Sequence, residues 1–300
     1  MQVPVYNFSH GLLNPGLGYL MSCLGSFLGL RCITRARAYT GRTRAIWLLL
    51  ASVALGATGI WVMQFIAMLG FTIPGRQILY NVPVTLISLL VAVVVVAVGL
   101  FIVGYAGGGL LPVLAGGAVI GLGVATMHYV GMSAMSMPDT VRYNVAMVGL
   151  SVLVAIVVGT AALVAGLHVR GVWSSLGASL VMGAAVTGMH YTGMAAMHIY
   201  AGGSGMTVSG RTSDNFLFPL LLSVSVLTFV LAMIITLSPN EEEILADAQL
   251  SRRLAPSADV ITLRAYSATG PGPEAYLDQA LDRLLDQHLN QPVDQSVEPS

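Results

Sequence analysis

Histidine and methionine recur in this sequence at a spacing that suits the binding of a metal ion. Three similar stretches occur, WVMQFIAMLGF at 61–71, ATMHYVGMSAM at 125–135 and TGMHYTGMAAM at 187–197. When they are aligned, equivalent columns hold Met63, Met127 and Met189, then Gln64, His128 and His190, and four residues later Met68, Met132 and Met194. The key positions are 64 and 62 residues apart, and a fixed period of this kind indicates an internal repeat.

Each of the last two stretches is expected to place its histidine and methionines on one face of a helix. His128, Met132 and Met135 fall at i, i+4 and i+7, as do His190, Met194 and Met197. Thioether sulfur favours Cu(I), and imidazole accepts copper in either oxidation state. The predicted membrane spans hold none of the carboxylates that Mg²⁺ or Ca²⁺ prefer. The donor set therefore predicts a soft metal, with copper as the expected cofactor.

Other interpretations of these residues stay open at this point. Methionine commonly fills gaps where helices pack, and a membrane histidine can form a hydrogen bond across helices in a purely structural role. Two histidines could also ligate a haem. Four further histidines are weaker candidates, with His10 and His198 expected near the site and His168 and His288 expected in solvent.

The composition predicts an all-α, polytopic membrane protein. Of 300 residues, 56% are hydrophobic and 9% are charged, against about 25% charged in a typical soluble domain. Stretches long enough to cross a bilayer are predicted near 12–33, 45–70, 82–104, 110–136, 143–168, 172–198 and 215–237. The three motifs fall on spans two, four and six of these seven, so the repeated unit is a pair of helices.

The arginines predict how these spans are oriented in the cell membrane. The first span is followed by Arg31, Arg35, Arg37, Arg42 and Arg44. Positive residues favour the cytoplasmic side, so we expect the N-terminus outside and the C-terminus in the cytoplasm. His128 and His190 lie 18 residues into their spans, about 27 Å at helical rise, which places them near the outer edge of the bilayer.

Several classes of protein are disfavoured by the sequence. No span carries Asp, Glu or Arg well inside it, which argues against a proton pump built on membrane carboxylates. The chain contains no lysine for a retinal Schiff base. We find no nucleophile–base pair, phosphate loop or carboxylate dyad, so no enzymatic activity is predicted, and no nucleic-acid partner. Cys23 and Cys32 are too far apart on one helix for a disulfide.

A change in composition divides the chain into two parts. Residues 1–240 carry nine Arg and two Asp, whereas residues 241–300 carry four Arg and eleven acidic residues. We predict a membrane domain over 1–238 and an acidic, mostly disordered cytoplasmic tail over 239–300, with an amphipathic helix within 274–290. Two pairs of glycines, Gly25/Gly29 and Gly117/Gly121, are expected to let helices pack closely.

The motifs MQFIAM, MHYVGM and MHYTGM resemble those of the MHYT domain, a bacterial membrane sensory domain. The resemblance implies seven helices, an outside N-terminus, copper binding through the motif residues, and sensing of a diatomic gas or a redox state. Carried over by position, it implicates Met63, Met68, Met127, His128, Met132, Met189, His190 and Met194. The first motif has Gln64 where the family usually has histidine, so the three-imidazole site is absent.

We therefore predict a stand-alone membrane sensor or signalling module that ligates copper near its outer face. Its partners would be the lipid bilayer and a cytoplasmic or membrane signalling protein. The alternative is a small transporter or a copper-handling permease, which a polar residue or a broken helix at mid-membrane would favour. A third interpretation is a structural membrane partner whose motifs only pack helices.

Overall fold

The computed structural model describes residues 2–202, 209–237, 280 and 282–284. By its internal contacts the chain divides into two units, Met1–Glu241 and Glu242–Ser300, and only the first is described in detail. The predictions of a disordered tail over 239–300 and of a complete helix over 274–290 lie almost entirely outside the described residues.

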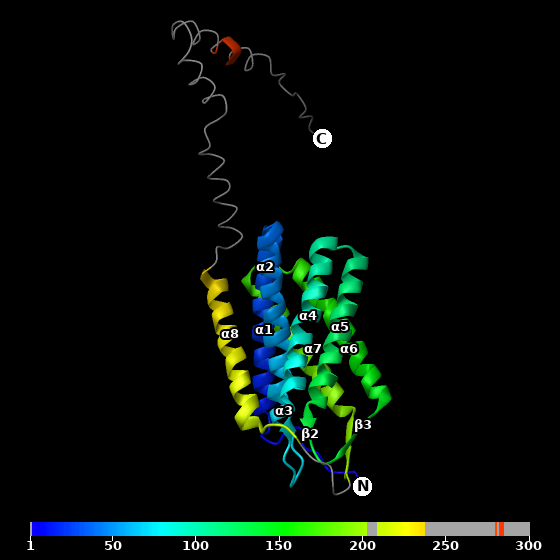
Figure 1. Cartoon of the computed structure of the whole chain (residues 1–300). Helices are drawn as coiled ribbons and strands as arrows, with labels where there is room; N and C mark the ends of the chain where they lie inside the picture. Colours follow the sequence, from blue (N-terminus) through cyan, green and yellow to red (C-terminus); the bar gives the residue numbers. More distant parts are fainter. Residues whose placement is uncertain (1, 203–208, 238–279, 281, 285–300) are drawn as a thin grey trace, which may run out of the picture. The chain divides into compact units, whose positions relative to one another are not determined.

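The first unit is a helical bundle with seven candidate membrane spans, as the sequence predicts. Span one is α1 (Leu13–Ala38), and span two runs without a break through α2 (Gly41–Ser52), η1 (Val53–Val62) and α3 (Met63–Leu69). The next four spans are α4 (Val82–Ala106), α5 (Leu110–Ser133), α6 (Val145–His168) and α7 (Val172–Ala195). The last span joins η2 (Ser213–Leu217) to α8 (Phe218–Leu237), which lies beside α1 (Figure 1).

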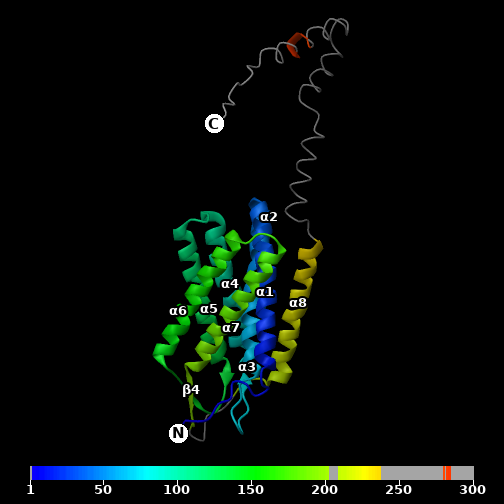
Figure 2. The same ribbon diagram turned by 180° about the vertical axis from the view of Figure 1, so that it is seen from behind.

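Four short strands lie at one end of this bundle, together with the N-terminal segment (Figure 2). β1 (Leu79–Tyr80) pairs with β2 (Met135–Ser136), and β3 (Thr140–Tyr143) pairs with β4 (Met197–Tyr200), both antiparallel. We call this end, with residues 2–12, 70–81, 134–144, 196–202 and 209–214, the motif end. The opposite end, with residues 31–44, 104–110 and 166–173, is called the arginine end.

Three equivalent backbone hydrogen bonds confirm that the repeated unit is a helix pair. In each, a residue that directly or shortly precedes an odd-numbered span donates to the residue six positions after a motif Gln or His. The bonds are Ser9 N to Gly70 O at 3.1 Å, Asn81 N to Ala134 O at 2.8 Å, and Asn144 N to Ala196 O at 2.8 Å. Each motif helix is thus tied to the start of its own helix pair. The seventh span, which contains α8, belongs to none of these three helix pairs.

Asparagine caps start two of the three returning helices at the motif end. The Asn81 side chain accepts from the backbone N–H of Val84, and Asn144 accepts from those of Ala146 and Met147. An amide oxygen at this position satisfies N–H groups that have no partner within the helix. These caps fix where α4 and α6 begin, and hence the register of each helix with its preceding strand.

The glycine pairs allow close helix packing, as predicted. A Cβ atom on Gly25 would collide with the backbone of Gly59 in η1, and one on Gly121 would collide with the backbone of Ile156 in α6. A Cβ on Gly117 would likewise strike Thr160. Small residues at such contacts bring helix backbones together and increase van der Waals packing, which is what drives helix association within lipid.

The sequence did not predict the π-helical geometry of η1, which directly precedes the first motif. Residues 53–62 follow the wider π spacing, and all but Val53 are buried. Two hydrogen bonds hold this segment to its neighbours. Trp61 Nε1 donates to Ser88 Oγ in α4 at 2.9 Å, and the hydroxyl groups of Thr58 and Thr228 in α8 lie 2.6 Å apart. π turns are often found at functional sites, and η1 lies directly beside the first motif.

Candidate functional site

All eight residues predicted as metal ligands are buried in one core cluster or directly at it. The two imidazoles are 0% and 1% exposed, and none of the six methionines is more than 3% exposed. These methionines belong to the same connected core. They are Met63, Met68, Met127, Met132, Met189 and Met194. The motifs therefore converge at the motif end of the bundle, as their shared column predicts.

The first and second motifs meet through Gln64 and His128. Gln64 Oε1 lies 3.2 Å from His128 Nδ1, and Gln64 Nε2 donates to the His128 carbonyl oxygen at 3.3 Å. Since an amide oxygen only accepts, Nδ1 must carry the imidazole proton. The lone pair of the ring is then on Nε2, which is the atom left to act as a ligand. Gln64 also donates to Met68 Sδ at 3.7 Å.

The second and third motifs meet through the two imidazoles. The ring centroids of His128 and His190 lie 5.0 Å apart, at an interplanar angle of 84°. Each ring also contacts the tyrosine that follows it, Tyr129 or Tyr191. One small ligand could therefore be reached from both imidazoles, and the predicted convergence of Gln64, His128 and His190 is confirmed.

Glycines in the next motif make room for these side chains. A Cβ atom on Gly131 would overlap the Gln64 amide, and one on Gly193 would overlap His128 at Nε2. Both glycines occupy the same motif column, where the first motif has Ala67. The imidazole of His128 thus fills the space that a side chain at position 193 would need, and its Nε2 packs directly against Gly193.

Three imidazole nitrogens are buried without a hydrogen-bond partner among the described residues. They are His128 Nε2, His190 Nδ1 and His190 Nε2. A buried polar atom without a partner is costly, which is an argument for a ligand at this position. The described residues contain no cluster of three or more His, Cys, Asp or Glu that could hold a metal. Any ion here would therefore need thioether sulfur as well as imidazole.

The residues present fit a soft metal ion on these grounds. The arrangement offers two imidazoles with nitrogen atoms that have no hydrogen-bond partner among the described residues, and methionines in the same core. A second polar group that orients a ligating histidine is a usual feature of metal sites, and Gln64 supplies it. The amide that replaces the family's third histidine is thus a positioning group here.

The prediction that one histidine and two methionines share a helical face is wrong for the second methionine of each motif. α5 ends at Ser133 and α7 ends at Ala195, so Met135 lies in β2 and Met197 in β4. The chain forms strands there because β2 pairs with Leu79–Tyr80 and β4 pairs with Thr140–Tyr143. Spans four and six are consequently three residues shorter at this end than predicted.

The other histidines lie apart from the two buried imidazoles. His10 and His168 are exposed, and His198 forms a hydrogen bond with Gln2 at 3.3 Å on the surface of the motif end. His10 is within 3.1 Å of its neighbour Ser9. Within the described part of the chain, neither His10 nor His198 has a hydrogen bond or ring contact with His128 or His190, so the structure does not bring them to the site.

The N-terminal segment covers the third motif. The ring of Phe8 contacts the ring of Tyr191, with 5.3 Å between centroids, and Tyr6 pairs with Thr72 after the first motif. Nearby, Asp139 forms an ion pair with Arg76 at 3.2 Å and its side chain is fully buried. The sequence analysis missed these covering residues, because no local pattern relates them to the motifs. In the sequence, the one indication of this covering role is that these residues lie before the first span or in the connections between two spans.

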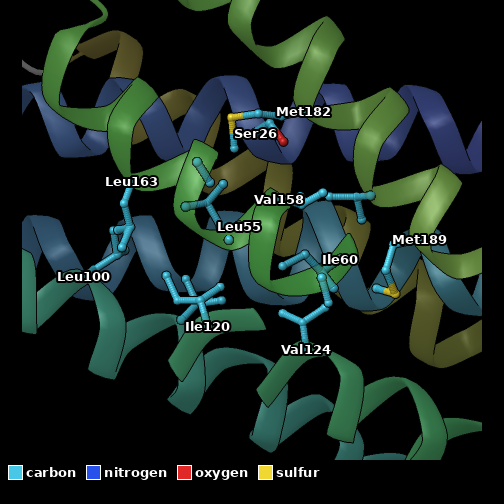
Figure 3. Close-up of a pocket in the computed structure, with 15 residues that line it drawn as sticks. Ser26, Leu55, Ile60, Leu100, Ile120, Val124, Val158, Leu163, Met182 and Met189 are labelled. Atoms are coloured by element: carbon cyan, nitrogen blue, oxygen red, sulfur yellow. The ribbon is translucent and has the colours of Figure 1, made fainter. Parts of the chain in front are cut away.

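An apolar cavity lies deeper in the bundle and reaches the third motif at Met189 (Figure 3). Its volume is about 40 Å³, and α1, η1 and α4 to α7 all contribute to its wall. Ser26 is the one polar side chain among its lining residues, and aliphatic residues such as Leu55 and Ile120 form most of the wall. The cavity therefore offers an ion no nitrogen or carboxylate ligand, only the Ser26 hydroxyl group and the thioethers of Met182 and Met189.

Comparison with known proteins identifies the repeats. The family model described as "Bacterial signalling protein N terminal repeat", MHYT, matches residues 58–116 and 121–179. These matches begin shortly before the first and second motifs. No solved structure matches the chain.

Curated relatives are longer signalling proteins. The bifunctional diguanylate cyclase/cyclic di-GMP phosphodiesterase MucR of Pseudomonas aeruginosa is 35% identical over 230 residues, covering 75% of this chain and 33% of MucR. The cyclic di-GMP phosphodiesterase NbdA of the same organism is 37% identical over 187 residues, covering 60% of this chain and 24% of NbdA. An uncharacterized signaling protein of Caulobacter vibrioides is 38% identical over 180 residues, 59% and 22% of the two chains. The chain thus spans a third or less of these relatives.

Proposed function

Because this chain belongs to the MHYT family of bacterial membrane signalling domains, we propose that it senses its signal through a copper ion held by His128 and His190. The observation that supports this proposal is the pair of buried imidazoles, with 5.0 Å between ring centroids, of which three nitrogens have no hydrogen-bond partner among the described residues. The buried methionines of the motifs would supply sulfur ligands.

The chemistry of the donors favours Cu(I) over Cu(II). Thioethers are soft ligands, and the site has more methionines than histidines. A reduced copper ion in an apolar, buried position can bind a small neutral molecule or lose an electron. Either event would give the domain a signal to transmit, which is the proposed role of the site in sensing a diatomic gas or a redox state.

The output is proposed to leave through a partner protein at the cytoplasmic side. MucR and NbdA are named as enzymes of cyclic di-GMP metabolism, and this chain covers 33% and 24% of their lengths. A separate protein carrying such an activity is one candidate partner. We propose no catalytic activity for the membrane domain itself.

Transport of copper is the alternative function, and the apolar cavity argues against it. An ion that crosses the bundle needs polar groups along its route, whereas the wall below the motifs offers only the Ser26 hydroxyl group and the thioethers of Met182 and Met189 among aliphatic residues. Among the described spans, the π-helical segment η1 departs most from regular α-helix. The side chains of Thr58 and Trp61 in this segment form hydrogen bonds with neighbouring helices and do not line an ion route. Sensing therefore accounts for the described geometry better than transport.

Metal analysis of the purified chain tests the copper site. Cells are grown with added copper, and copper per protein is measured after purification under reducing conditions. We expect about one copper per chain and X-ray absorption features of both nitrogen and sulfur ligands. A parent protein that stays free of copper under these conditions, while correctly folded, would contradict the proposal.

A further inference from the structure

Positively charged residues gather at the arginine end of the bundle. Six arginines lie there, at positions 31, 35, 37, 42, 44 and 170. Within residues 2–202 and 209–237 the only acidic residues are Asp139 and Asp214, and both belong to the motif end. An excess of positive charge beside a bilayer attracts anionic lipids.

Two of these arginines stand at the rim of an apolar cleft between four helices. Arg37 at the end of α1 donates through Nη1 to the carbonyl oxygen of Leu167, in the last turn of α6, at 2.7 Å. Arg44 in α2 lies with its guanidinium carbon 5.3 Å from the centre of the Tyr105 ring, in the last turn of α4. These contacts place both guanidinium groups where the helices end, at the level of the lipid head groups.

The cleft below them is lined by aliphatic groups and glycine. It has a volume of about 50 Å³, and apart from the two arginines its wall contains no polar side chain. The wall consists of Ile33, Ala36, Leu48, Leu100, Val103, Gly104, Leu163, Gly166 and Leu167. An apolar cavity of this kind stays free of water and can bind an apolar molecule, so a hydrocarbon chain matches its wall.

One nitrogen at this rim is already short of a partner. Arg44 Nε is buried and has no hydrogen-bond acceptor among the described residues. Guanidinium groups bind phosphate in a planar, two-pronged geometry, and a phosphate oxygen would satisfy this N–H. A phospholipid supplies both an anionic phosphate and a hydrocarbon chain, and the seven spans place the cleft in a bilayer.

We propose that Arg37, Arg44 and the apolar cleft between α1, α2, α4 and α6 bind one anionic phospholipid. Its phosphate lies against the two guanidinium groups, and part of one acyl chain enters the cleft. The acidic segment Glu241–Glu243 of the same chain is a different occupant, but three carboxylates would match only the rim and leave the aliphatic wall without a partner. The lipid matches both parts.

The test measures lipid binding to the purified full chain in neutral detergent. Native mass spectrometry follows titrations with dioleoyl phosphatidylglycerol and with dioleoyl phosphatidylcholine, which share their acyl chains. We expect one phosphatidylglycerol to bind at least tenfold more tightly than phosphatidylcholine. Equal binding of the two lipids would overturn the proposal.

Matched variants separate a defined site from diffuse charge. Arg37→Gln with Arg44→Gln should weaken phosphatidylglycerol binding about tenfold or more, whereas Arg42→Gln with Arg170→Gln removes the same charge from the same end and should change it less than twofold. An equal loss in both pairs would show that no specific site exists. Should the first pair fail to fold, Arg44→Gln alone, which loses no hydrogen bond seen in the structure, must still lower the affinity severalfold.

Two further arms distinguish the other occupants. Glycerol 1-phosphate, which has the phosphate without the chains, should compete at least a hundredfold more weakly than the lipid if the cleft binds hydrocarbon. Changing Glu241, Glu242 and Glu243 together to Gln should leave lipid affinity unchanged. A severalfold rise in that variant would mean that the acidic segment occupies the cleft, and the lipid assignment would be wrong.

Discussion

The amide oxygen of Gln64 lies 3.2 Å from Nδ1 of His128, so the first motif orients the imidazole of the second. The same amide donates to the carbonyl oxygen of His128, which fixes its orientation. The proton is held on Nδ1, and Nε2 packs against Gly193. A position that looks from the sequence like a lost ligand is therefore part of the site's support.

Removing this support should weaken copper binding without removing a ligand. In Gln64→Leu, Nδ1 of His128 loses its partner and the ring can change tautomer, so we expect copper affinity to fall by about 10- to 100-fold. Competition with a Cu(I) chelator measures the affinity. Gln77→Leu, at an exposed position, is the control and should bind copper like the parent. An unchanged affinity in Gln64→Leu would show that the amide does not support the site.

Restoring an imidazole in the first motif should change the metal preference. Gln64→His adds a nitrogen donor beside His128, and Cu(II) prefers nitrogen to sulfur ligands. We expect a stronger Cu(II) electron paramagnetic resonance signal with more nitrogen coupling than in the parent. The prediction is wrong if the oxidised variant retains no more Cu(II) than the oxidised parent.

Removing both imidazoles should abolish copper binding while the fold remains. His128→Ala with His190→Ala eliminates every available nitrogen of the pair, whereas an interhelical hydrogen bond in a membrane contributes only about 0.6 kcal/mol on average. Copper content and the thermal unfolding midpoint in detergent are measured together. His10→Ala with His168→Ala, at exposed positions, should keep the parent's copper. Loss of folding with no copper in the parent is the outcome expected if the histidines only pack helices.

A methyl group added at Gly193 should disturb the site more than a methyl group added at Gly188. Gly193→Ala forces the His128 ring to move, and an overpacked core typically costs about 1–3 kcal/mol. Gly188→Ala lies on the same helix, where an added Cβ meets no atom within 4 Å. We expect reduced stability and reduced copper binding only in Gly193→Ala, measured by thermal unfolding and metal analysis. Equal behaviour of the two variants would contradict the described packing.

The ion pair at the motif end should stabilise the covering segments. Asp139 is buried, pairs with Arg76 at 3.2 Å and accepts the Gly202 N–H at 3.3 Å. Asp139→Asn leaves the Arg76 charge without its partner. Because Arg76 is partly exposed, we expect a loss of about 1–3 kcal/mol, below the range for fully buried pairs. The exposed Asp214→Asn is the control for the change in charge, and chemical unfolding in detergent provides the comparison.

The orientation in the membrane can be tested by cysteine labelling in intact cells. The arginine distribution predicts that Ser9→Cys and Ser204→Cys react with an impermeant reagent, whereas Ser296→Cys does not. The native Cys23 and Cys32 are buried, so they should contribute little background. Labelling of position 296 from outside would reverse the predicted orientation.

Much of the fold could be predicted because its signals are local. Long apolar stretches need no partner to be recognised, and the repeat of 64 and 62 residues predicted that spans two, four and six carry equivalent sites. The glycine pairs at Gly25 and Gly121 likewise reflect close helix packing. Each prediction rests on residues near one another in the chain, or on a column that the repeat makes visible.

The remaining features depend on contacts that only the folded chain makes. Met135 and Met197 continue the helical spacing, yet pairing with residues from a distant part of the chain draws them into strands. Gln64 gains its role from a histidine 64 residues away, and Arg37 and Arg44 gain theirs from the ends of two other helices. The sequence by itself determined which residue types are repeated and which segments span the membrane. The tertiary structure decided which polar atoms face one another, because hydrogen bonds and close packing act over a few ångströms in space, whatever the separation along the chain.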